Sequence, residues 1–227
     1  MLPLLALLPF AGALLLAALP NDRRRLCAWL AGAFPLAGLA LALAQAPAIM
    51  AGEVLRWSVD WVPALGLEFG FRMDGLAWLF ALLILGIGAL VVLYAAYYLH
   101  HDDPSARFFQ FLLLFMGAML GIVLADNLVL LVVFWEATSL SSFLLIGYWK
   151  DREDAREGAR MALAITGAGG LALLAGVLLI GHIVGSVRLD VVLASGDLIR
   201  AHPLYVPALV LVLLGAFTKS AQFPFHF

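Results

Sequence analysis

Two ionisable residues of opposite charge lie inside apolar stretches of this 227-residue sequence. Glu136 lies in the segment FWEATSLSS, and Lys219 lies in LLGAFTKSAQFPFHF. A charged side chain deep in a membrane costs at least about 2.5–3.5 kcal/mol, so such residues are normally paired or functional. An acid and a base at this depth have the chemistry to pass protons or to bind a cation. The alternatives are a helix-packing hydrogen bond for Glu136 and a purely structural ion pair for Lys219.

Hydroxyl side chains follow Glu136 within two turns of the expected helix. Thr138, Ser139 and Ser142 could bind water or donate hydrogen bonds to the carboxylate. Hydroxyls are also common at contacts between membrane helices, so a packing role is the alternative. We include these three residues in the candidate proton or ion pathway.

Two residues after Lys219 suggest how its helix ends. Pro224 lacks a backbone N–H and disfavours a helical conformation at the preceding residue, so the sequence predicts a break one turn beyond Lys219. A simple kink is the alternative. His226 follows the proline, and because imidazole titrates near neutral pH it is a further candidate for a proton relay.

The sequence contains no other pattern typical of catalysis or cofactor binding. It has no metal-ligand spacing, no nucleophile–base motif and no Gly-rich phosphate loop. The single cysteine, Cys27, excludes an internal disulfide framework. The net charge of −2 gives no indication of a nucleic-acid partner. We therefore expect a protein that is not an enzyme and that holds no metal or cofactor.

The composition is that of a membrane protein, with 65% hydrophobic and only 12% charged residues. A bilayer core of about 30 Å requires around 20 helical residues. Seven stretches qualify, the last of them truncated, and the sequence therefore predicts an all-α polytopic bundle of about seven transmembrane helices. The expected helices cover residues 2–20, 26–47, 74–98, 107–125, 128–148, 160–185 and 204–227.

Loop charges predict the orientation of this bundle. If Met1 lies outside, the inward loops hold eight basic residues and the outward loops hold four, which agrees with the positive-inside rule. The first apolar run carries its arginines after the hydrophobic core, whereas a signal peptide carries them before it. We expect this run to be a retained helix with its N-terminus outside.

Two outward loops are expected to fold. Apolar residues alternate with polar ones on either side of Pro63 and Gly66, which predicts a small β-hairpin near residues 57–71 on the outer surface. Residues 186–202 mix charged and apolar side chains and are expected to form an interfacial helix. Asp74, and Asp126 with Asn127, precede expected helices and are placed to cap them.

Long segments around the buried charges resemble a known family. The stretches LLLFMGAMLGIVLADNLVLLVVFWEATSLSSFLLIGYW and LVLLGAFTKSAQFPFHF are similar to the large A subunit of Mrp-type multisubunit sodium/proton antiporters. DGLAWLFALLILGIGALVVLYAAYYL and the outer segment WVPALGLEFGFRMDG resemble the same subunit. The resemblance to antiporter-like subunits of respiratory complex I and membrane-bound hydrogenases is weaker.

The resemblance implies roles for particular residues. The glutamate of the family's fifth helix falls on Glu136, the lysine of its broken seventh helix on Lys219, and the histidine after the break on His226. The family fold contains two inverted five-helix repeats, the first beginning at helix four. We therefore expect residues 1–106 to form three N-terminal helices with the hairpin. Residues 107–227 would then start the first repeat, as a fragment or split part of a longer chain.

The implied function is that of a proton-conducting subunit. It would exchange cytoplasmic sodium, or a similar monovalent cation, for outside protons in a multi-pass complex of the bacterial inner membrane. Its partners would be other Mrp-type subunits, membrane lipids, Na⁺ and H⁺. One alternative is a proton-pumping subunit of a redox complex related to complex I or a hydrogenase. Another is a membrane scaffold that does not transport.

Overall fold

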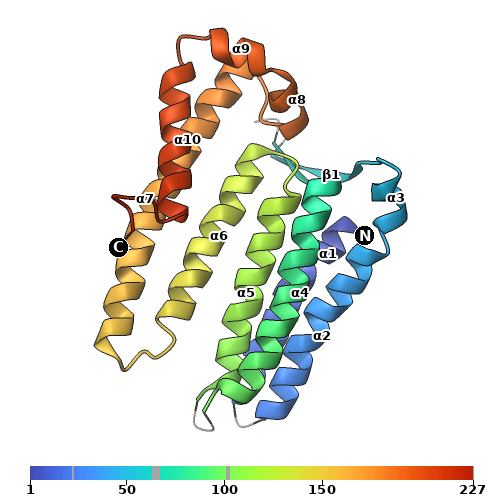
Figure 1. Cartoon of the computed structure of the whole chain (residues 1–227), viewed down its shortest axis with the longest axis vertical. Coiled ribbons are helices and arrows are strands. Elements are labelled where there is room, and N and C mark those ends of the chain that lie inside the picture. The colour runs from blue at the N-terminus through green and yellow to red at the C-terminus, as the bar shows by residue number, and fades with distance from the viewer. Residues whose placement is uncertain (22, 63–66, 101–102, 227) are drawn as a thin grey trace. The chain divides into compact units, whose positions relative to one another are not determined.

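The structure, a computed structural model, describes residues 1–21, 23–62, 67–100 and 103–226. Most of these residues are helical, and a two-stranded sheet interrupts the helices between residues 55 and 73 (Figure 1). The chain divides into two compact units. The first comprises Met1–Trp57 and Phe71–Leu124, and the second comprises Ser58–Gly70 and Ala125–Phe227. The mostly helical fold with a small sheet agrees with the fold class expected from the sequence.

The first unit is a bundle in which helices pack closely through glycines. Its helices are α1 (Leu2–Ala17), α2 (Arg24–Leu43), the short α3 (Ala46–Met50), α4 (Gly75–Tyr98) and α5 (Ser105–Leu124). Helix α1 packs on α2 and α5, and α2 also packs on α4. A Cβ atom at Gly12 would lie 2.6 Å from the Phe34 ring, and one at Gly117 would lie 2.7 Å from the Phe10 ring. Because lipid supplies no hydrophobic force between helices, such close contacts stabilise the bundle.

The second unit is organised around one long helix. Its helices are α6 (Leu128–Ile146), α7 (Glu153–Val184), α8 (Leu189–Ala194), α9 (Gly196–Ala201) and α10 (Tyr205–Lys219). Helix α7 packs against both α6 and α10. Val132 of α6 forms a buried apolar cluster with Leu173 and Val177 of α7. The predicted domain boundary at residue 106 groups α5 with the second part, whereas in the structure α5 packs within the first unit.

The predicted hairpin is present. Strands β1 (Leu55–Val62) and β2 (Leu67–Met73) pair with each other. The alternating aromatic residues meet across the strands: Trp57 stacks on Phe71 with ring centroids 6.2 Å apart, and Trp61 lies edge-on to Phe69 at 6.3 Å. Such cross-strand aromatic pairs stabilise a two-stranded sheet. Pro63 and Gly66, expected between the strands, lie outside the described residues.

Several helices have the length and composition to cross a membrane. Among the described residues these are five, α2, α4, α5, α6 and α7, while α1 and α10 are shorter apolar helices of 16 and 15 residues. At 1.5 Å per residue, α1 and α10 are about 24 and 22 Å long, less than a bilayer core. The chain is therefore a multi-pass membrane protein. The number of seven spans and the outward N-terminus stay predictions.

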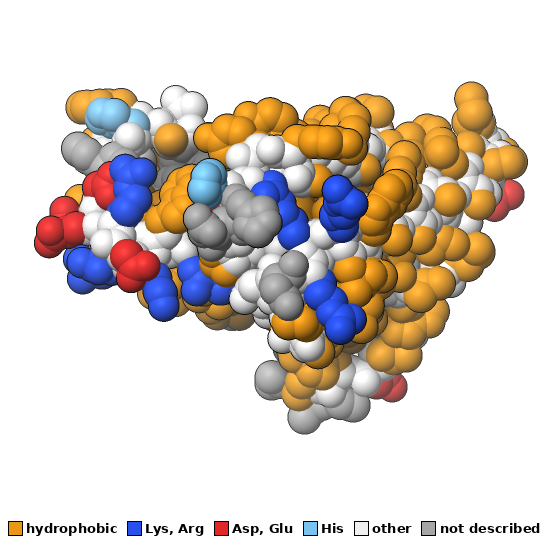
Figure 2. All heavy atoms as spheres, turned by 90° about the horizontal axis from the view of Figure 1, so that it is seen from below, with side chains coloured by type: hydrophobic (Ala, Val, Ile, Leu, Met, Phe, Trp, Pro, Cys, Tyr) orange, Lys and Arg blue, Asp and Glu red, His pale blue; other side chains and the backbone are white. Residues whose placement is uncertain are grey.

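Charged and apolar side chains are segregated as a membrane requires. Figure 2 looks onto the end of the molecule at which α6 connects to α7, and Lys, Arg, Asp and Glu side chains gather there. Apolar side chains cover the flanks of the helices in the same view. Large apolar residues such as Trp29, Leu90 and Val206 are exposed on the helices, as lipid-facing side chains are.

Helix α10 ends earlier than the sequence predicts. The expected helix ran over residues 204–227 with a break at Pro224, whereas helical structure stops at Lys219. Ala221 adopts a left-handed conformation with φ of 50°, and the Gln222 N–H donates to the Phe217 carbonyl at 3.0 Å. This is the hydrogen-bonding pattern of a Schellman motif, in which the left-handed residue directly follows the C-cap. The termination is therefore made by the residues before the proline.

The expected interfacial helix is two short ones, α8 and α9, and the outer end of the second unit is held by backbone pairing. The Asp126 N–H donates to the Gly70 carbonyl at 3.0 Å, and the Leu189 N–H donates to the Asp126 carbonyl at 2.9 Å. Residues Asn127 and Arg188 form an antiparallel bridge. These bonds join the hairpin, the start of α6 and the segment before α8, so the backbone polar groups of all three are satisfied.

Two of the expected helix caps form. Asp74 Oδ1 accepts a hydrogen bond from the Ala77 N–H at 2.9 Å, and Asn127 Oδ1 accepts one from the Leu130 N–H at 2.8 Å. Asn127 Nδ2 also donates to the Glu68 carbonyl at 2.7 Å. Asp126 does not cap α6; its backbone pairs with the hairpin and with the segment before α8 instead.

The two bonds of Asn127 can be separated by substitution. Asn127→Ala removes both and should cost about 2 kcal/mol, because a lost N-cap and a lost neutral hydrogen bond are each worth about 1 kcal/mol. Asn127→Ser keeps a capping oxygen and loses only the bond to Glu68, so it should cost about half as much. Thermal unfolding of the purified full-length complex measures this order. Equal stability of the two variants would contradict the double role.

Candidate functional site

The predicted site residues come from two helices of the second unit and from the segment after them. Helix α6 carries Glu136 and the three hydroxyl residues, and Lys219 is the last residue of α10. Pro224 and His226 lie beyond the end of α10, and both are exposed. The ring of His226 lies 5.5 Å from that of Phe223. The structure therefore brings Glu136, Ser139 and Lys219 into one bundle and leaves Pro224 and His226 in the following segment.

The Lys219 ammonium is held against α6. Its Nζ donates a hydrogen bond to Ser139 Oγ at 3.0 Å and lies 5.7 Å from the centroid of the Trp135 ring. Ser139 is buried and Lys219 is half-buried. A cation near an aromatic face is stabilised by about 0.5–2 kcal/mol, the more so where water is excluded. A hydroxyl and an aromatic ring thus replace part of the hydration that the ammonium loses.

Glu136 lies near this ammonium without a direct ion pair. Among the described residues, no salt bridge within 4.0 Å joins the two, although their charges interact electrostatically. The Glu136 Oε1 atom is buried and has no hydrogen-bond partner among the described side chains and backbone. A buried carboxylate oxygen of this kind is costly, and protonation removes much of the cost. The geometry suits a carboxyl group that exchanges a proton.

The other hydroxyls of α6 bond to their own helix. Thr138 Oγ1 donates to the Trp135 carbonyl at 2.7 Å, and Ser141 Oγ donates to the Ala137 carbonyl at 2.7 Å. Each hydroxyl oxygen keeps lone pairs that can accept a further bond. Ser142 is partly buried on the last turns of α6. Of the three predicted hydroxyls, Ser139 is the one that contacts a charged group of the site.

Sequence reasoning missed four residues that surround the charges. Trp135 lies beside the Lys219 ammonium, and Gly170 of α7 lies against the Glu136 carboxylate. Gly169 lies against Thr218, the residue before Lys219. The segment ITGAGGLALLAG, which contains both glycines, indicates close helix packing, but its sequence does not reveal which neighbours each glycine faces.

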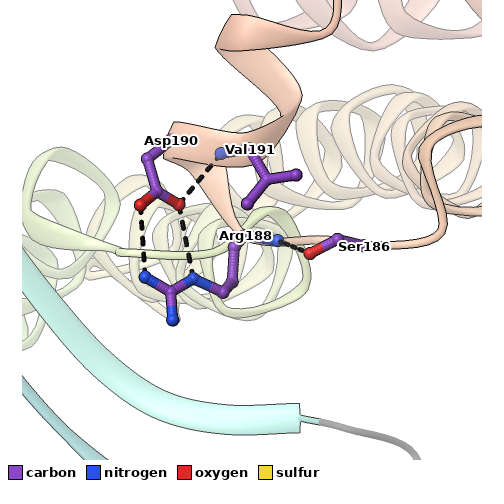
Figure 3. A network of polar contacts seen from close by, with 4 residues as sticks. All are labelled: Ser186, Arg188, Asp190 and Val191. Atoms are coloured by element: carbon purple, nitrogen blue, oxygen red, sulfur yellow. Dashed lines mark hydrogen bonds and ion pairs between the residues drawn. The ribbon is translucent and has the colours of Figure 1, made fainter.

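A second polar cluster lies at the outer end of the same unit. Arg188 Nε and Nη2 donate to the two carboxylate oxygens of Asp190 at 3.3 and 3.1 Å, and Ser186 Oγ accepts from the Arg188 N–H (Figure 3). These bonds to Asp190 raise the pKa of Arg188 above its usual range. A cavity of about 10 Å³, the size of one water molecule, lies beside Arg188 and is lined by Glu68, Gly70, Asp126, Asn127 and Val187. The cluster fixes the loop before α8.

The structure shows no metal centre: among the described residues, no group of three or more His, Cys, Asp or Glu side chains is placed to hold a metal ion.

Comparison with known proteins places these residues in a family. Residues 125–227 match the family described as "NADH:quinone oxidoreductase/Mrp antiporter, TM", and residues 60–109 match "NADH-Ubiquinone oxidoreductase (complex I), chain 5 N-terminus". The whole chain is 58% identical to 23% of the A/B subunit of a probable K(+)/H(+) antiporter of Rhizobium meliloti. The chain belongs to the Mrp-type antiporter A-subunit family. It corresponds to the N-terminal part of that protein.

Two further Mrp relatives agree with this assignment. The chain is 46% identical to the A subunit of the Na(+)/H(+) antiporter of Alkalihalophilus pseudofirmus, over 96% of the chain and 27% of the relative. The fold is similar to that of a chain in the Mrp complex from Dietzia, with a TM-score of 0.81, 35% identity, and coverage of 99% of this chain and 24% of the other. The chain thus spans about a quarter of the length of these relatives.

The bond between Lys219 and Ser139 gives a test of the site. Ser139→Ala removes the acceptor of the ammonium, and since a hydrogen bond to a charged group is worth about 1.5–3 kcal/mol, proton-coupled exchange by the full-length complex should fall about tenfold or more. Exchange is measured as the collapse of a pH gradient in everted membrane vesicles after addition of NaCl or KCl.

Ser141→Ala is the matched control. Ser141 is also buried on α6, but its hydroxyl bonds to carbonyls of its own helix. This variant should exchange at close to the rate of the parent complex. A loss of similar size in both variants would mean that helix packing, and not the ammonium contact, explains the effect of Ser139.

Proposed function

We propose that this chain is the proton-handling N-terminal part of a subunit that exchanges a monovalent cation for protons. The observation that supports this most directly is the arrangement of Glu136 and Lys219. A buried carboxyl group lies within electrostatic reach of an ammonium that is held by Ser139 and Trp135 rather than by the carboxylate itself. An acid and a base that are close but not locked together can change partners.

The proposed mechanism alternates between two arrangements of charge. In one, Glu136 is ionised and attracts the Lys219 ammonium; in the other, Glu136 carries a proton and Lys219 stays on Ser139 and Trp135. Buried pairs gain from mutual attraction but lose hydration, so the two arrangements differ by little free energy. A proton that reaches Glu136, or a cation that binds nearby, shifts the balance. The ammonium then passes its proton along the hydroxyls and, beyond the helix end, toward His226.

The cation is a monovalent one. The relatives are named as subunits of a K⁺/H⁺ and of a Na⁺/H⁺ antiporter, so both ions are candidate substrates, with cytoplasmic Na⁺ exchanged for outside protons as the specific proposal. Other Mrp-type subunits are the proposed protein partners, and the bacterial inner membrane is the proposed location. Transport belongs to the full-length protein in its complex, of which this chain spans about a quarter.

A second candidate is proton pumping in a redox complex. The family description that matches residues 125–227 also covers NADH:quinone oxidoreductase, and the same pair of charges would serve that function. Neighbouring reading frames separate the two candidates. Genes for small antiporter subunits support cation exchange, whereas genes for quinone-reductase or hydrogenase subunits support redox-driven pumping.

Substitution of the two charges tests the proposal. In the full-length complex, Glu136→Ala and Lys219→Ala should each abolish cation-driven proton movement in everted vesicles, because each removes one proton carrier. Complex abundance on native gels should stay unchanged. Normal exchange in either variant would refute the mechanism.

The double variant Glu136→Gln with Lys219→Met distinguishes transport from a structural ion pair. A scaffold that needs only a satisfied pair would keep its function when both charges are removed together. A proton pathway would not.

A further inference from the structure

Two adjacent glycines of α7 contact the two halves of the charged site. A Cβ atom at Gly170 would overlap Glu136 Oε1 and lie 2.6 Å from Glu136 Cδ. A Cβ atom at Gly169 would overlap Thr218 Oγ1 and lie 2.7 Å from Thr218 Cβ. Successive residues of a helix point about 100° apart, so neighbouring positions of α7 face two different helices. Gly170 faces α6, and Gly169 faces α10.

The carboxylate occupies the space that a side chain at position 170 would fill. Glu136 Oε1 is buried, has no hydrogen-bond partner among the described residues, and lies almost where an alanine Cβ would be. The direction of the carboxyl group is therefore set by the absence of a side chain on α7. No other polar atom of the described protein directs this oxygen.

Gly169 acts on the other charge through the helix backbone. Thr218 is buried, and its hydroxyl donates to the Gly215 carbonyl of the same helix at 2.9 Å, so its side chain is fixed relative to α10. A Cβ atom at Gly215 would in turn lie 2.7 Å from Leu173 Cβ and 3.0 Å from the Gly169 carbonyl. This close approach of α7 and α10 sets where the next residue, Lys219, meets Ser139.

The contacts are specific to these two glycines. Gly167 belongs to the same Gly-rich segment of α7, yet a Cβ atom there would meet nothing within 4 Å. General helix packing would not distinguish position 167 from positions 169 and 170 in this way. A property shared by all small residues of α7 therefore does not explain the contact with Glu136.

We propose that Gly170 and Gly169 are positioning residues of the proton pathway: Gly170 directs the Glu136 carboxyl group, and Gly169 sets the approach of Lys219 to α6. This inference rests on the proposed function, because it assigns the glycines to the same pair of charges. The pair has to stay close without forming a fixed ion pair, and a displacement of about 1 Å in such a site costs about 100-fold in rate.

The experiment compares Gly170→Ala with Gly167→Ala in the full-length protein, assembled in its complex and assayed in everted vesicles with NaCl and with KCl. Gly170→Ala should lower exchange by about 100-fold. Gly167→Ala adds the same methyl group to the same helix where space is open, and it should exchange like the parent. Equal activity of the two alanine variants would overturn the inference.

A compensating substitution separates positioning from simple packing. Glu136→Asp shortens the acid by one methylene and withdraws the carboxylate from position 170. The double variant Gly170→Ala with Glu136→Asp should therefore recover the exchange rate of Glu136→Asp alone. If Gly170→Ala prevents assembly, the double variant should restore the complex on native gels. A double variant that stays unassembled, or that remains less active than Glu136→Asp, would overturn the proposal.

One further variant keeps the two proposals apart. Glu136→Gln retains the shape of the side chain and removes its proton chemistry. If this variant exchanges normally, the proposed proton role of Glu136 fails, whatever the glycine variants do. If it is inactive while Gly170→Ala and Gly167→Ala behave alike, the proton role stands and only the assignment of Gly170 fails.

Discussion

The loss of hydration by Glu136 and Lys219 is the constraint that organises the second unit. An ion taken out of water loses several kcal/mol unless other groups replace the water. The protein supplies these groups unevenly: the ammonium has a hydroxyl and an aromatic ring on α6, whereas the carboxylate oxygen faces only the bare backbone of α7. The acid is therefore the less satisfied partner, and it gains most from a proton. This asymmetry requires α7 to approach both neighbouring helices closely, which glycine permits.

The outer end of the unit satisfies a different demand. Backbone groups near a membrane need hydrogen-bond partners, and the loops before α6 and α8 provide them for each other and for the hairpin. Asn127 joins this pairing to the first turn of α6 through two side-chain bonds. Helix α6, which carries Glu136 and Ser139, is thereby fixed at its outer end. The charged site lies two turns and more along the same helix.

Much of this architecture could be predicted from the sequence, because the strong signals are local. Long apolar runs predicted the helices, alternating aromatic residues predicted the hairpin, and Asp74 and Asn127 predicted caps. The end of α10 was predicted wrongly, since a left-handed alanine is not a residue preferred for helix termination. The partners of Gly169 and Gly170 could not be predicted, because a side chain that is absent leaves no pattern to indicate which helix comes close. The roles of the candidate proton residues remain predictions.

The early end of α10 has an electrostatic consequence. The peptide dipoles of a helix add to about half a negative charge at its C-terminus, located on the carbonyls of the last turn. Because α10 stops at Lys219 rather than continuing to Pro224, this negative end coincides with the ammonium. The lysine thus has a permanent counter-charge that no proton can neutralise. When Glu136 takes up a proton, the ammonium is left with the field of its own helix, so the site can release one partner without stranding a bare cation in the membrane.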